Sequence, residues 1–284
     1  MTALQGGRPG PPALLQDAGR PGLAALGITA SGAFDRAAFR AGAALVGNDP
    51  SGRDAAIEIT LGGLAVRAVG GAVRVALTGA PVPATVAGLA APYGRAFGLA
   101  DGDELALGIP PRGLRSYLSV RGGLLAEPEF GSRSRDLLAH LGPPPLRAGD
   151  VLEVGGAPAW LPAADESAAV VPPDVLEVLP GPRRDWLADP AALARQWEVS
   201  PQSDRVGVRL LGEPLAWAAA RVGTELASEP VVRGGIQLPP AGLPVLFGPD
   251  HPTTGGYPVV GVIADPDQLA QLRPGDRIGL RWSD

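Results

Sequence analysis

Short runs of alternating apolar and polar residues recur along the chain and predict β-strands. In AVRVALTG (Ala72–Gly79), Val73, Val75 and Leu77 fall on one face and Arg74 on the other, as a strand with one buried face requires. The pattern therefore predicts a mainly β protein. Further runs of this kind lie at residues 57–61, 64–69, 116–120 and 243–247.

Helical periodicity is confined to a few short segments. The clearest is DRAAFRAGAALVGNDP at residues 35–50, in which apolar residues share one face and Gly47 follows as a stop signal. A second helix is predicted at residues 190–197 and a third at residues 265–272, where Asp265 is expected to cap the N-terminus.

A repeated motif divides the chain into two parts. LRAGDVLEV (146–154) and LRPGDRIGL (272–280) share Leu-Arg-x-Gly-Asp followed by alternating apolar residues, and LADGDELAL (99–107) is a looser copy. Each predicts a Gly-Asp turn that leads into a strand, although such turns are common and one large β domain is the alternative. The predicted division is an N-terminal β unit at 1–155, a Pro/Ala-rich linker at 156–174 and a C-terminal β unit at 175–284.

Composition excludes several classes of chemistry. The 284 residues include no cysteine and no lysine, so a disulfide framework, a thiolate metal site, a P-loop lysine and a Schiff-base lysine are all excluded. The net charge of −5 and the lack of a basic run argue against nucleic acid as a partner.

The start of the chain and its longest uncharged run bear on location. MTALQGGRPGPPALLQ has neither the charged start nor the continuous apolar core of a signal peptide, which favours the cytoplasm. The uncharged run at residues 75–94 is long enough to span a membrane, but prolines, glycines and alanines interrupt it. We therefore expect strands and a loop there, and no membrane association.

Motif searches remove three further classes. Glycines spaced i, i+2 do not occur, so the GxGxxG dinucleotide motif is missing, as is a GxSxG nucleophile elbow. His140 and His251 lie outside any metal-ligand motif, and no metal site is predicted.

Polar residues concentrate in five segments predicted as loops: QDAGRPG, SGAFD, GSRSRD, SPQSDR and HPTTGGYP. Five such loops in a chain otherwise poor in polar residues suggest that they converge on a ligand. The candidate catalytic residues are Asp17, Arg20, Asp204 and Arg205. The candidate residues for binding substrate or ATP are Ser31, Asp35, Ser132, Arg133, Ser200, Gln202, Ser203, Thr253, Thr254, Gly255, Gly256 and Tyr257.

Each loop also has a structural interpretation. Asp17 either orients Arg20 toward a substrate carboxylate or phosphate, or simply pairs with it across a turn. SPQSDR is either part of a site or a capped turn. Gly255 and Gly256 either form a nest of N–H groups for an anion or a plain turn between two strands.

Nine segments, in order, resemble one family. They are LLQDAGRPG, GITASGAFDRAAFRAGAALVGN, AAIEITLGG, ALTGA, GSRSRDLLA, VLPGPRRDW, VSPQSDRVGVRL, GGIQLPPAGLPVLFGPDHPTTGGYP and LAQLRPGD. Together they resemble the biotin-dependent carboxyltransferase / allophanate hydrolase subunit 2 family, which includes the C subunits of 5-oxoprolinase. This resemblance implies two cyclophilin-like β-barrel units with a few short helices, and a companion subunit of related fold.

The resemblance also implies a set of reactions and partners. Free-standing members are commonly the C subunit of an ATP-dependent 5-oxoprolinase, which opens a lactam to glutamate together with a B-type subunit (allophanate hydrolase subunit 1-like) and a separate A subunit. ATP with Mg²⁺, shared with a partner subunit, is then the expected cofactor.

Two alternatives remain open within the same family. Some members transfer carboxyl from biotin to urea, and because this chain has no lysine the biotin would be carried by a separate protein. Others are regulatory partners of a protein that inhibits a kinase.

Overall fold

The chain folds into two units rich in β-strands, and the structure, a computed structural model, describes residues 1–283. The N-terminal unit comprises residues 1–20, 31–136 and 140–171; the C-terminal unit comprises residues 21–30, 137–139 and the chain from 172 onward. The mainly β fold is confirmed. The assignment of the two short segments, 21–30 and 137–139, to the C-terminal unit was not anticipated from the sequence.

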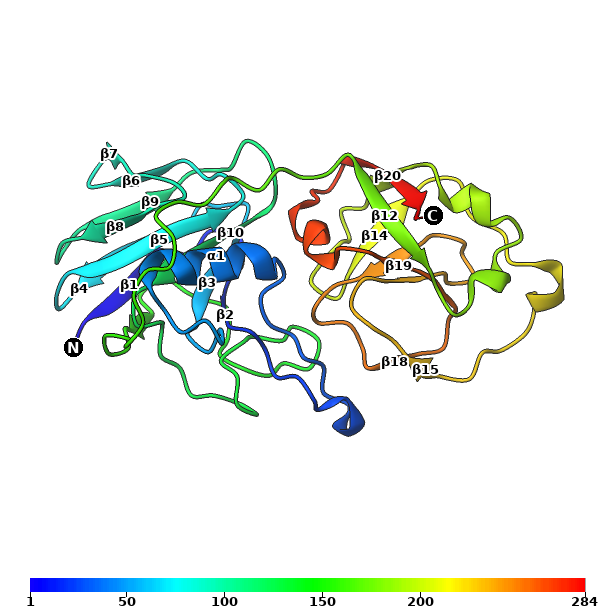
Figure 1. Cartoon of the computed structure of the whole chain (residues 1–284), viewed down its shortest axis with the longest axis horizontal. Helices are drawn as coiled ribbons and strands as arrows, with labels where there is room; N and C mark the ends of the chain where they lie inside the picture. The colour runs from blue at the N-terminus through cyan, green and yellow to red at the C-terminus, as the bar shows by residue number, and fades with distance from the viewer. Residues whose placement is uncertain (284) are drawn as a thin grey trace. The chain divides into compact units, whose positions relative to one another are not determined.

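The N-terminal unit contains two antiparallel sheets (Figure 1). The six-stranded sheet has, in order across it, β11 (Val151–Glu153), β1 (Ala3–Arg8), β4 (Ala65–Val69), β9 (Glu104–Leu107), β6 (Ala84–Val86) and β7 (Leu89–Ala90). The five-stranded sheet has β2 (Ala13–Gln16), β3 (Ala56–Thr60), β10 (Arg115–Val120), β5 (Val73–Gly79) and β8 (Ala96–Leu99).

One hydrophobic core joins these two sheets. Leu4 and Val66 from the six-stranded sheet belong to the same buried cluster as Val75, Leu77 and Leu118 from the five-stranded sheet. Fully burying one such side chain contributes roughly 1.5–3 kcal/mol, so this shared core is the main stabilising feature of the unit. The strands expected to form a barrel here are arranged as two sheets around a common core.

The helix α1 (Arg36–Val46) lies against β5 and β10 of the five-stranded sheet, as Figure 1 shows. The Asp35 carboxylate accepts a hydrogen bond from the Ala38 N–H at the start of the helix, and Gly47 ends it with a left-handed φ of 71°. The predicted helix and its stop signal are confirmed.

The C-terminal unit contains a closed barrel of seven strands. Leu176, Val208, Ile236, Leu246 and Ile278 are buried in it. The predicted barrel is confirmed for this unit. In order around the barrel the strands are β12 (Val175–Pro180), β19 (Val259–Ile263), β16 (Gly235–Gln237), β17 (Val245–Phe247), β14 (Gly207–Leu211), β13 (Gln196–Val199) and β20 (Arg277–Trp282).

Smaller elements complete the described chain. β15 and β18 form a separate two-stranded ribbon. Among the described residues, no helix has the length and apolar character needed to cross a membrane. The bounds of these elements are β15 (Glu229–Pro230), β18 (Thr254–Gly255), and the 3₁₀ helices η1 (Ala24–Leu26), η2 (Arg184–Trp186), η3 (Pro190–Leu193), η4 (Ala219–Arg221) and η5 (Pro266–Gln271).

One helix prediction is wrong in its second half. Residues 190–197 were expected to be helical, but only η3 is, and Trp197 lies in strand β13. The Trp197 side chain is buried, and its indole N–H donates to the Leu193 carbonyl oxygen at 3.0 Å. Burial of this large ring in the barrel and pairing of β13 with β20 override the local helical pattern.

The other local predictions agree with the structure. Asp265 caps η5 by accepting from the Asp267 N–H, although the helix is 3₁₀ rather than α. The three Gly-Asp motifs each precede a strand: β9, β11 and β20.

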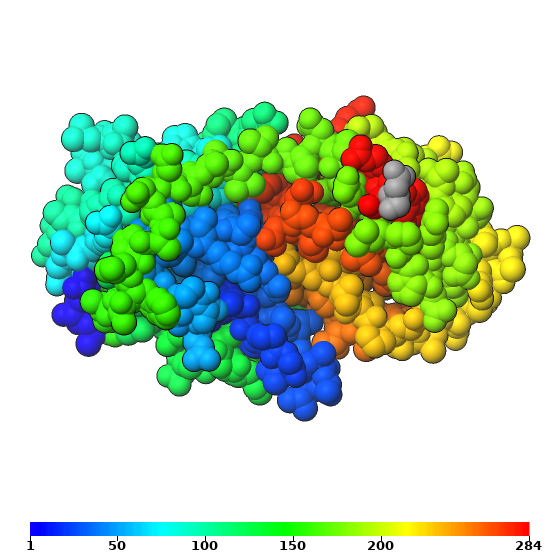
Figure 2. Space-filling view, in the orientation of Figure 1, coloured from blue at the N-terminus to red at the C-terminus, as the bar shows by residue number. Residues whose placement is uncertain are grey.

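Most of the Pro/Ala-rich segment packs along the N-terminal unit. The N–H groups of Ala163, Ser167 and Val170 donate to carbonyl oxygens of residues 44, 94 and 79 of that unit, and the segment is green on the surface in Figure 2. Although its composition is typical of a linker, residues up to Val171 are part of the N-terminal unit.

A left-handed turn connects β3 to β4 and so links the two sheets. Leu61, Gly62 and Gly63 have φ values of 58°, 70° and 76°. A Cβ atom at Gly62 would lie 1.8 Å from the Gly108 carbonyl oxygen. This turn therefore requires glycine at position 62, both for its backbone angle and for the space.

We expect Gly62→Ala to lower the free energy of unfolding by at least about 2 kcal/mol, because it adds left-handed strain and a clash with backbone. Urea unfolding of the variant and the parent measures the difference. Gly98→Ala is the matched control, since a Cβ there meets no atom within 4 Å. Equal stability of the two variants would contradict the assignment.

Candidate functional site

The carboxylate of Asp17 lies at the centre of a buried polar cluster in the N-terminal unit. Its side chain is 3% exposed and accepts hydrogen bonds from the hydroxyls of Ser132 at 2.6 Å and Ser134 at 2.5 Å. The N–H groups of Gly19 and Arg133 donate to it at 2.8 and 2.7 Å. Two of the five predicted loops, QDAGRPG and GSRSRD, are thus brought together although they lie far apart in the sequence, whereas SPQSDR and HPTTGGYP belong to the C-terminal unit.

Arg20 belongs to the same cluster but does not pair with Asp17 among the described residues. Its guanidinium donates to the carbonyl oxygens of Ser134 and, at 3.3 Å, Glu129. The side chain is 2% exposed, and its Nη1 is buried with no hydrogen-bond partner in the described chain. Neither predicted interpretation of Asp17 with Arg20, the ion pair or the direct orientation, describes these contacts.

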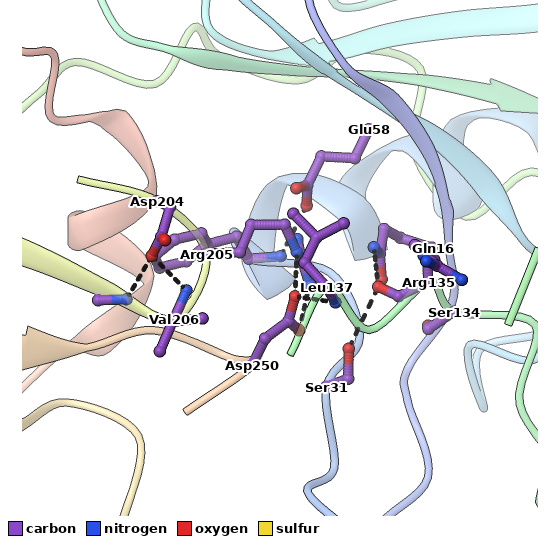
Figure 3. A network of polar contacts seen from close by, with 12 residues as sticks. Gln16, Ser31, Glu58, Ser134, Arg135, Leu137, Asp204, Arg205, Val206 and Asp250 are labelled. Atoms are coloured by element: carbon purple, nitrogen blue, oxygen red, sulfur yellow. Dashed lines mark hydrogen bonds and ion pairs between the residues drawn. The ribbon is translucent and has the colours of Figure 1, made fainter. Parts of the chain in front are cut away.

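Gln16 adds a second unpaired atom to this cluster. Its Nε2 donates to the Arg135 carbonyl oxygen at 2.9 Å, while its Oε1 is buried without a partner in the described part of the chain. Figure 3 shows that Ser31 also contacts the Arg135 carbonyl oxygen, to which its Oγ donates at 3.4 Å. Arg20 donates to the Ser134 carbonyl oxygen and Gln16 to that of Arg135, the next residue. The unpaired donor Arg20 Nη1 and the unpaired acceptor Gln16 Oε1 therefore belong to side chains that bind the same short backbone segment.

The SGAFD loop is held by a buried glutamate and a buried tyrosine. Glu58 Oε2 accepts from the Phe34 N–H and from the Tyr117 hydroxyl, each at 2.8 Å. The Tyr117 hydroxyl in turn accepts from the Asp35 N–H at 2.7 Å. Ser31, in this loop, is buried with a φ of 50°. Glu58 and Tyr117 therefore fix the loop that carries two predicted site residues.

Burial controls the ionisation of two tyrosines beside this loop. Burial, followed by the charges of Glu58 and Asp35, raises the pKa of Tyr117 well above its usual value. Burial, followed by the charge of Asp35, raises the pKa of Tyr93 to about 12. Both hydroxyls therefore stay protonated to a higher pH than a solvent-exposed tyrosine, and Tyr93 donates to the Gly79 carbonyl oxygen at 2.5 Å.

SPQSDR forms a capped turn between β13 and β14. Asp204 is exposed, and its Oδ1 accepts from the N–H groups of Val206 and Gly207 at 2.8 and 3.0 Å. Ser200 Oγ accepts from the Gln202 N–H, and Ser203 Oγ from the Arg209 N–H. These contacts favour the structural interpretation of this loop over a catalytic role for Asp204.

Arg205 and Asp250 form a buried two-pronged ion pair in the C-terminal unit. Arg205 Nε lies 2.8 Å from Asp250 Oδ2, and Nη2 lies 3.0 Å from Oδ1. Asp250 Oδ2 also accepts from the Leu137 N–H at 3.0 Å, as Figure 3 shows. Arg205 therefore anchors the residue that precedes HPTTGGYP. Removing one partner of such a buried pair lowers the free energy of unfolding by about 3–5 kcal/mol, so the pair has a structural role.

HPTTGGYP does not form the left-handed nest expected from its glycines. Neither Gly255 nor Gly256 has a positive φ, and Thr254 and Gly255 form β18, paired with Glu229 and Pro230. A Cβ at Gly255 would lie 2.6 Å from Nε2 at the end of the flexible Gln237 side chain, which would have to shift. The expected anion nest is wrong in its backbone geometry.

Gly256 and Tyr257 instead line a pocket of about 610 Å³ in the C-terminal unit. Tyr257 also lines a second pocket of about 240 Å³, next to Glu229 and Val259. Tyr257 therefore forms part of the wall of both pockets. Thr253 lines neither pocket, and its carbonyl oxygen accepts from the Val231 N–H at 3.1 Å.

Sequence reasoning missed Gln16, Glu58, Tyr117 and Asp250, which hold or complete the candidate loops. Glu58 and Tyr117 occupy strands β3 and β10, where a polar residue inside an apolar run was the available signal. No group of three or more His, Asp or Glu side chains in residues 1–283 is arranged to hold a metal ion.

The model of one protein family, the carboxyltransferase domain with subdomains A and B, matches residues 26–282. The chain belongs to this carboxyltransferase domain family. The resemblance drawn from the nine sequence segments is therefore confirmed.

Curated relatives and a solved structure agree with the family assignment. This carboxyltransferase domain is 36% identical to the C subunit of Escherichia coli 5-oxoprolinase, over 93% of this chain and 86% of that protein. It is 32% identical to a putative urea carboxylase of Emericella nidulans, over 94% of this chain and 23% of that protein. The Kluyveromyces lactis urea carboxylase structure matches with a TM-score of 0.90 and 28% identity, over 98% of this chain and 27% of that one.

The raised pKa of Tyr93 gives a prediction at high pH. The unfolded chain loses the Tyr93 proton near pH 10 and the folded chain near pH 12, so stability is lost as pH rises between these values. Tyr93→Phe should flatten this part of the curve of unfolding free energy against pH. Urea unfolding at several pH values tests this, and an unchanged slope in the variant would contradict it.

Proposed function

We propose that this carboxyltransferase domain is the C subunit of a cytoplasmic, ATP-dependent 5-oxoprolinase that works with a B-type subunit and a separate A subunit. The observation that carries the proposal is the 36% identity to the C subunit of Escherichia coli 5-oxoprolinase over 93% of the chain. The Haemophilus influenzae protein of the same name, 31% identical over 94% of the chain, supports it.

The carbonyl carbon of a lactam is a poor electrophile, and its amide group is a poor nucleophile. The reaction therefore has to activate the lactam. In the proposed step the lactam carbonyl oxygen attacks the γ-phosphorus of ATP and the bond to ADP breaks. Water then adds to the activated carbon, the C–N bond of the ring breaks with the nitrogen taking up a proton, and inorganic phosphate leaves to give glutamate. Negative charge on the phosphoryl oxygens requires cationic donors, and arginine supplies these without lysine. In this proposal Mg²⁺ arrives with ATP and is shared with a partner subunit.

The Asp17 cluster is the proposed contact with the lactam. The unpaired Arg20 Nη1 is a donor suited to a carbonyl oxygen, and the unpaired Gln16 Oε1 is an acceptor suited to an amide N–H. A lactam presents these two groups side by side. Both atoms are buried, so ligand binding requires a local rearrangement that uncovers them.

A second candidate is a biotin-dependent carboxyltransferase subunit. The name of the matching family and the TM-score of 0.90 to Kluyveromyces lactis urea carboxylase favour it. Since the chain has no lysine, biotin would be attached to a separate protein. In that reaction an amide nitrogen, rather than an amide oxygen, is the nucleophile.

Reconstitution with the B-type and A subunits tests the leading proposal. We expect the complex to convert 5-oxoproline and ATP to glutamate and ADP, and the isolated chain to have no turnover. Glutamate and ADP are measured together. No turnover by the verified complex, or full activity of the purified chain alone, would refute the proposal; carboxylation by added carboxybiotin carrier would favour the second candidate.

The hydroxyl of Thr254 tests the HPTTGGYP loop. Thr254 is exposed, and its hydroxyl has no partner among residues 1–283. If it binds ligand, Thr254→Val should lower kcat/KM of the complex by about 2- to 10-fold, the effect of one hydrogen bond of about 0.5–1.5 kcal/mol. Thr85→Val, in the N-terminal unit, is the matched control. An unchanged kcat/KM, melting temperature and partner affinity would leave the loop as a structural element.

A further inference from the structure

The pocket of about 610 Å³ in the C-terminal unit has the size of a small-molecule site. Its walls are mainly apolar and aromatic, and it does not include any of the buried residues of the Asp17 cluster. The residues that matter for its chemistry are Leu215, Trp217, Glu225, Leu226, Pro240 and Tyr257.

Two aromatic side chains, Trp217 and Tyr257, form part of the wall. Trp217 makes an edge-to-face contact with Trp186, with ring centroids 5.1 Å apart and planes at 83°. Trp186 is 2% exposed, so the contact fixes Trp217 against the buried part of the unit. Tyr257 is 45% exposed and stands where this pocket and the smaller one share a wall. Two aromatic rings thus line the pocket.

Glu225 is the one charged residue in the described lining of the pocket. It is exposed and makes no hydrogen bond or ion pair with residues 1–283. Arg221, which directly precedes the lining residues 222–226, is already paired with Asp185 at 2.5 Å. The negative charge of Glu225 is therefore left for a ligand.

We propose that this pocket binds an organic cation with a flat apolar body, such as an aromatic amidine. The apolar body would pack against Leu215, Leu226 and Pro240, and the cationic group would lie near Glu225. The faces of Trp217 and Tyr257 add attraction, because the ring quadrupole favours a cation by about 0.5–2 kcal/mol. A carboxylate in this pocket would be repelled by Glu225.

This inference is separate from the proposed function. The substrate 5-oxoproline carries a carboxylate and no cationic group, so it has the wrong charge for this pocket. A cation bound here is therefore a different ligand, and binding can be measured on the chain without ATP, partner subunits or turnover.

Benzamidine, benzamide and benzoate test the proposal because they share size and shape but differ in charge. Titrated separately into the chain and followed by calorimetry, benzamidine should bind at least about 10-fold more tightly than either of the others. Glu225→Gln should reduce the preference for benzamidine over benzamide to less than about 3-fold and leave the affinity for benzamide unchanged.

Two further variants distinguish binding in the pocket from nonspecific attraction of a cation to the negatively charged chain. Glu198→Gln removes an exposed carboxylate on β13, outside the lining, and should keep the full preference for benzamidine. Tyr257→Leu should weaken benzamidine binding by a few-fold, since it replaces one aromatic wall. Circular dichroism melting confirms that each variant is folded.

Three outcomes would overturn the proposal. One is no benzamidine binding up to about 10 mM, a concentration at which even very weak sites fill. The second is equal affinity for the three compounds. The third is a benzamidine preference that survives Glu225→Gln, which would place the cation elsewhere on the chain.

Discussion

The arrangement of the N-terminal candidate site depends on one buried carboxylate. Moving an ionised carboxylate out of water is very costly unless hydrogen bonds replace the water. Asp17 meets this requirement with two serine hydroxyls and two backbone N–H groups, and its own carbonyl oxygen accepts from the Ala33 N–H at 3.0 Å. The carboxylate therefore fixes residues 17–19 relative to residues 132–134, and the backbone carbonyl of Asp17 adds the loop at 31–35 through Ala33.

The C-terminal unit also contains a buried carboxylate, but its main hydrogen-bond partner is different. Asp250 is also a fully buried carboxylate at the start of a polar loop, but there Arg205 supplies two of the donors. The guanidinium compensates the charge, whereas Asp17 relies on neutral donors alone. Arg205 is consequently committed to its carboxylate, while Arg20, which does not pair with a carboxylate among the described residues, keeps a free N–H on Nη1.

Sequence patterns predicted the elements whose stability is local or periodic, such as the helix α1 with its Asp35 cap and the strands that follow the Gly-Asp turns. Trp197 was misplaced because distant strands of the barrel set its environment. The candidate site was predictable only as a set of loops, since Asp17 meets Ser132 across 115 residues, a pairing that composition cannot encode. Glu58 gave a signal, a charged residue inside an apolar run, but the sequence does not show the partners that satisfy it, Phe34 and Tyr117.

The two units also differ in the charge that they offer to a ligand. The Asp17 cluster holds a spare arginine N–H and suits a carbonyl or phosphoryl oxygen, whereas the aromatic pocket contains Glu225 and suits a cation. Each arrangement is completed within its own unit by its own buried supports, Asp17 in one and Trp186 in the other. Substitutions at sites that share no partners have additive effects on the free energy of unfolding. A substitution that alters the chemistry of one unit therefore needs no compensating substitution in the other.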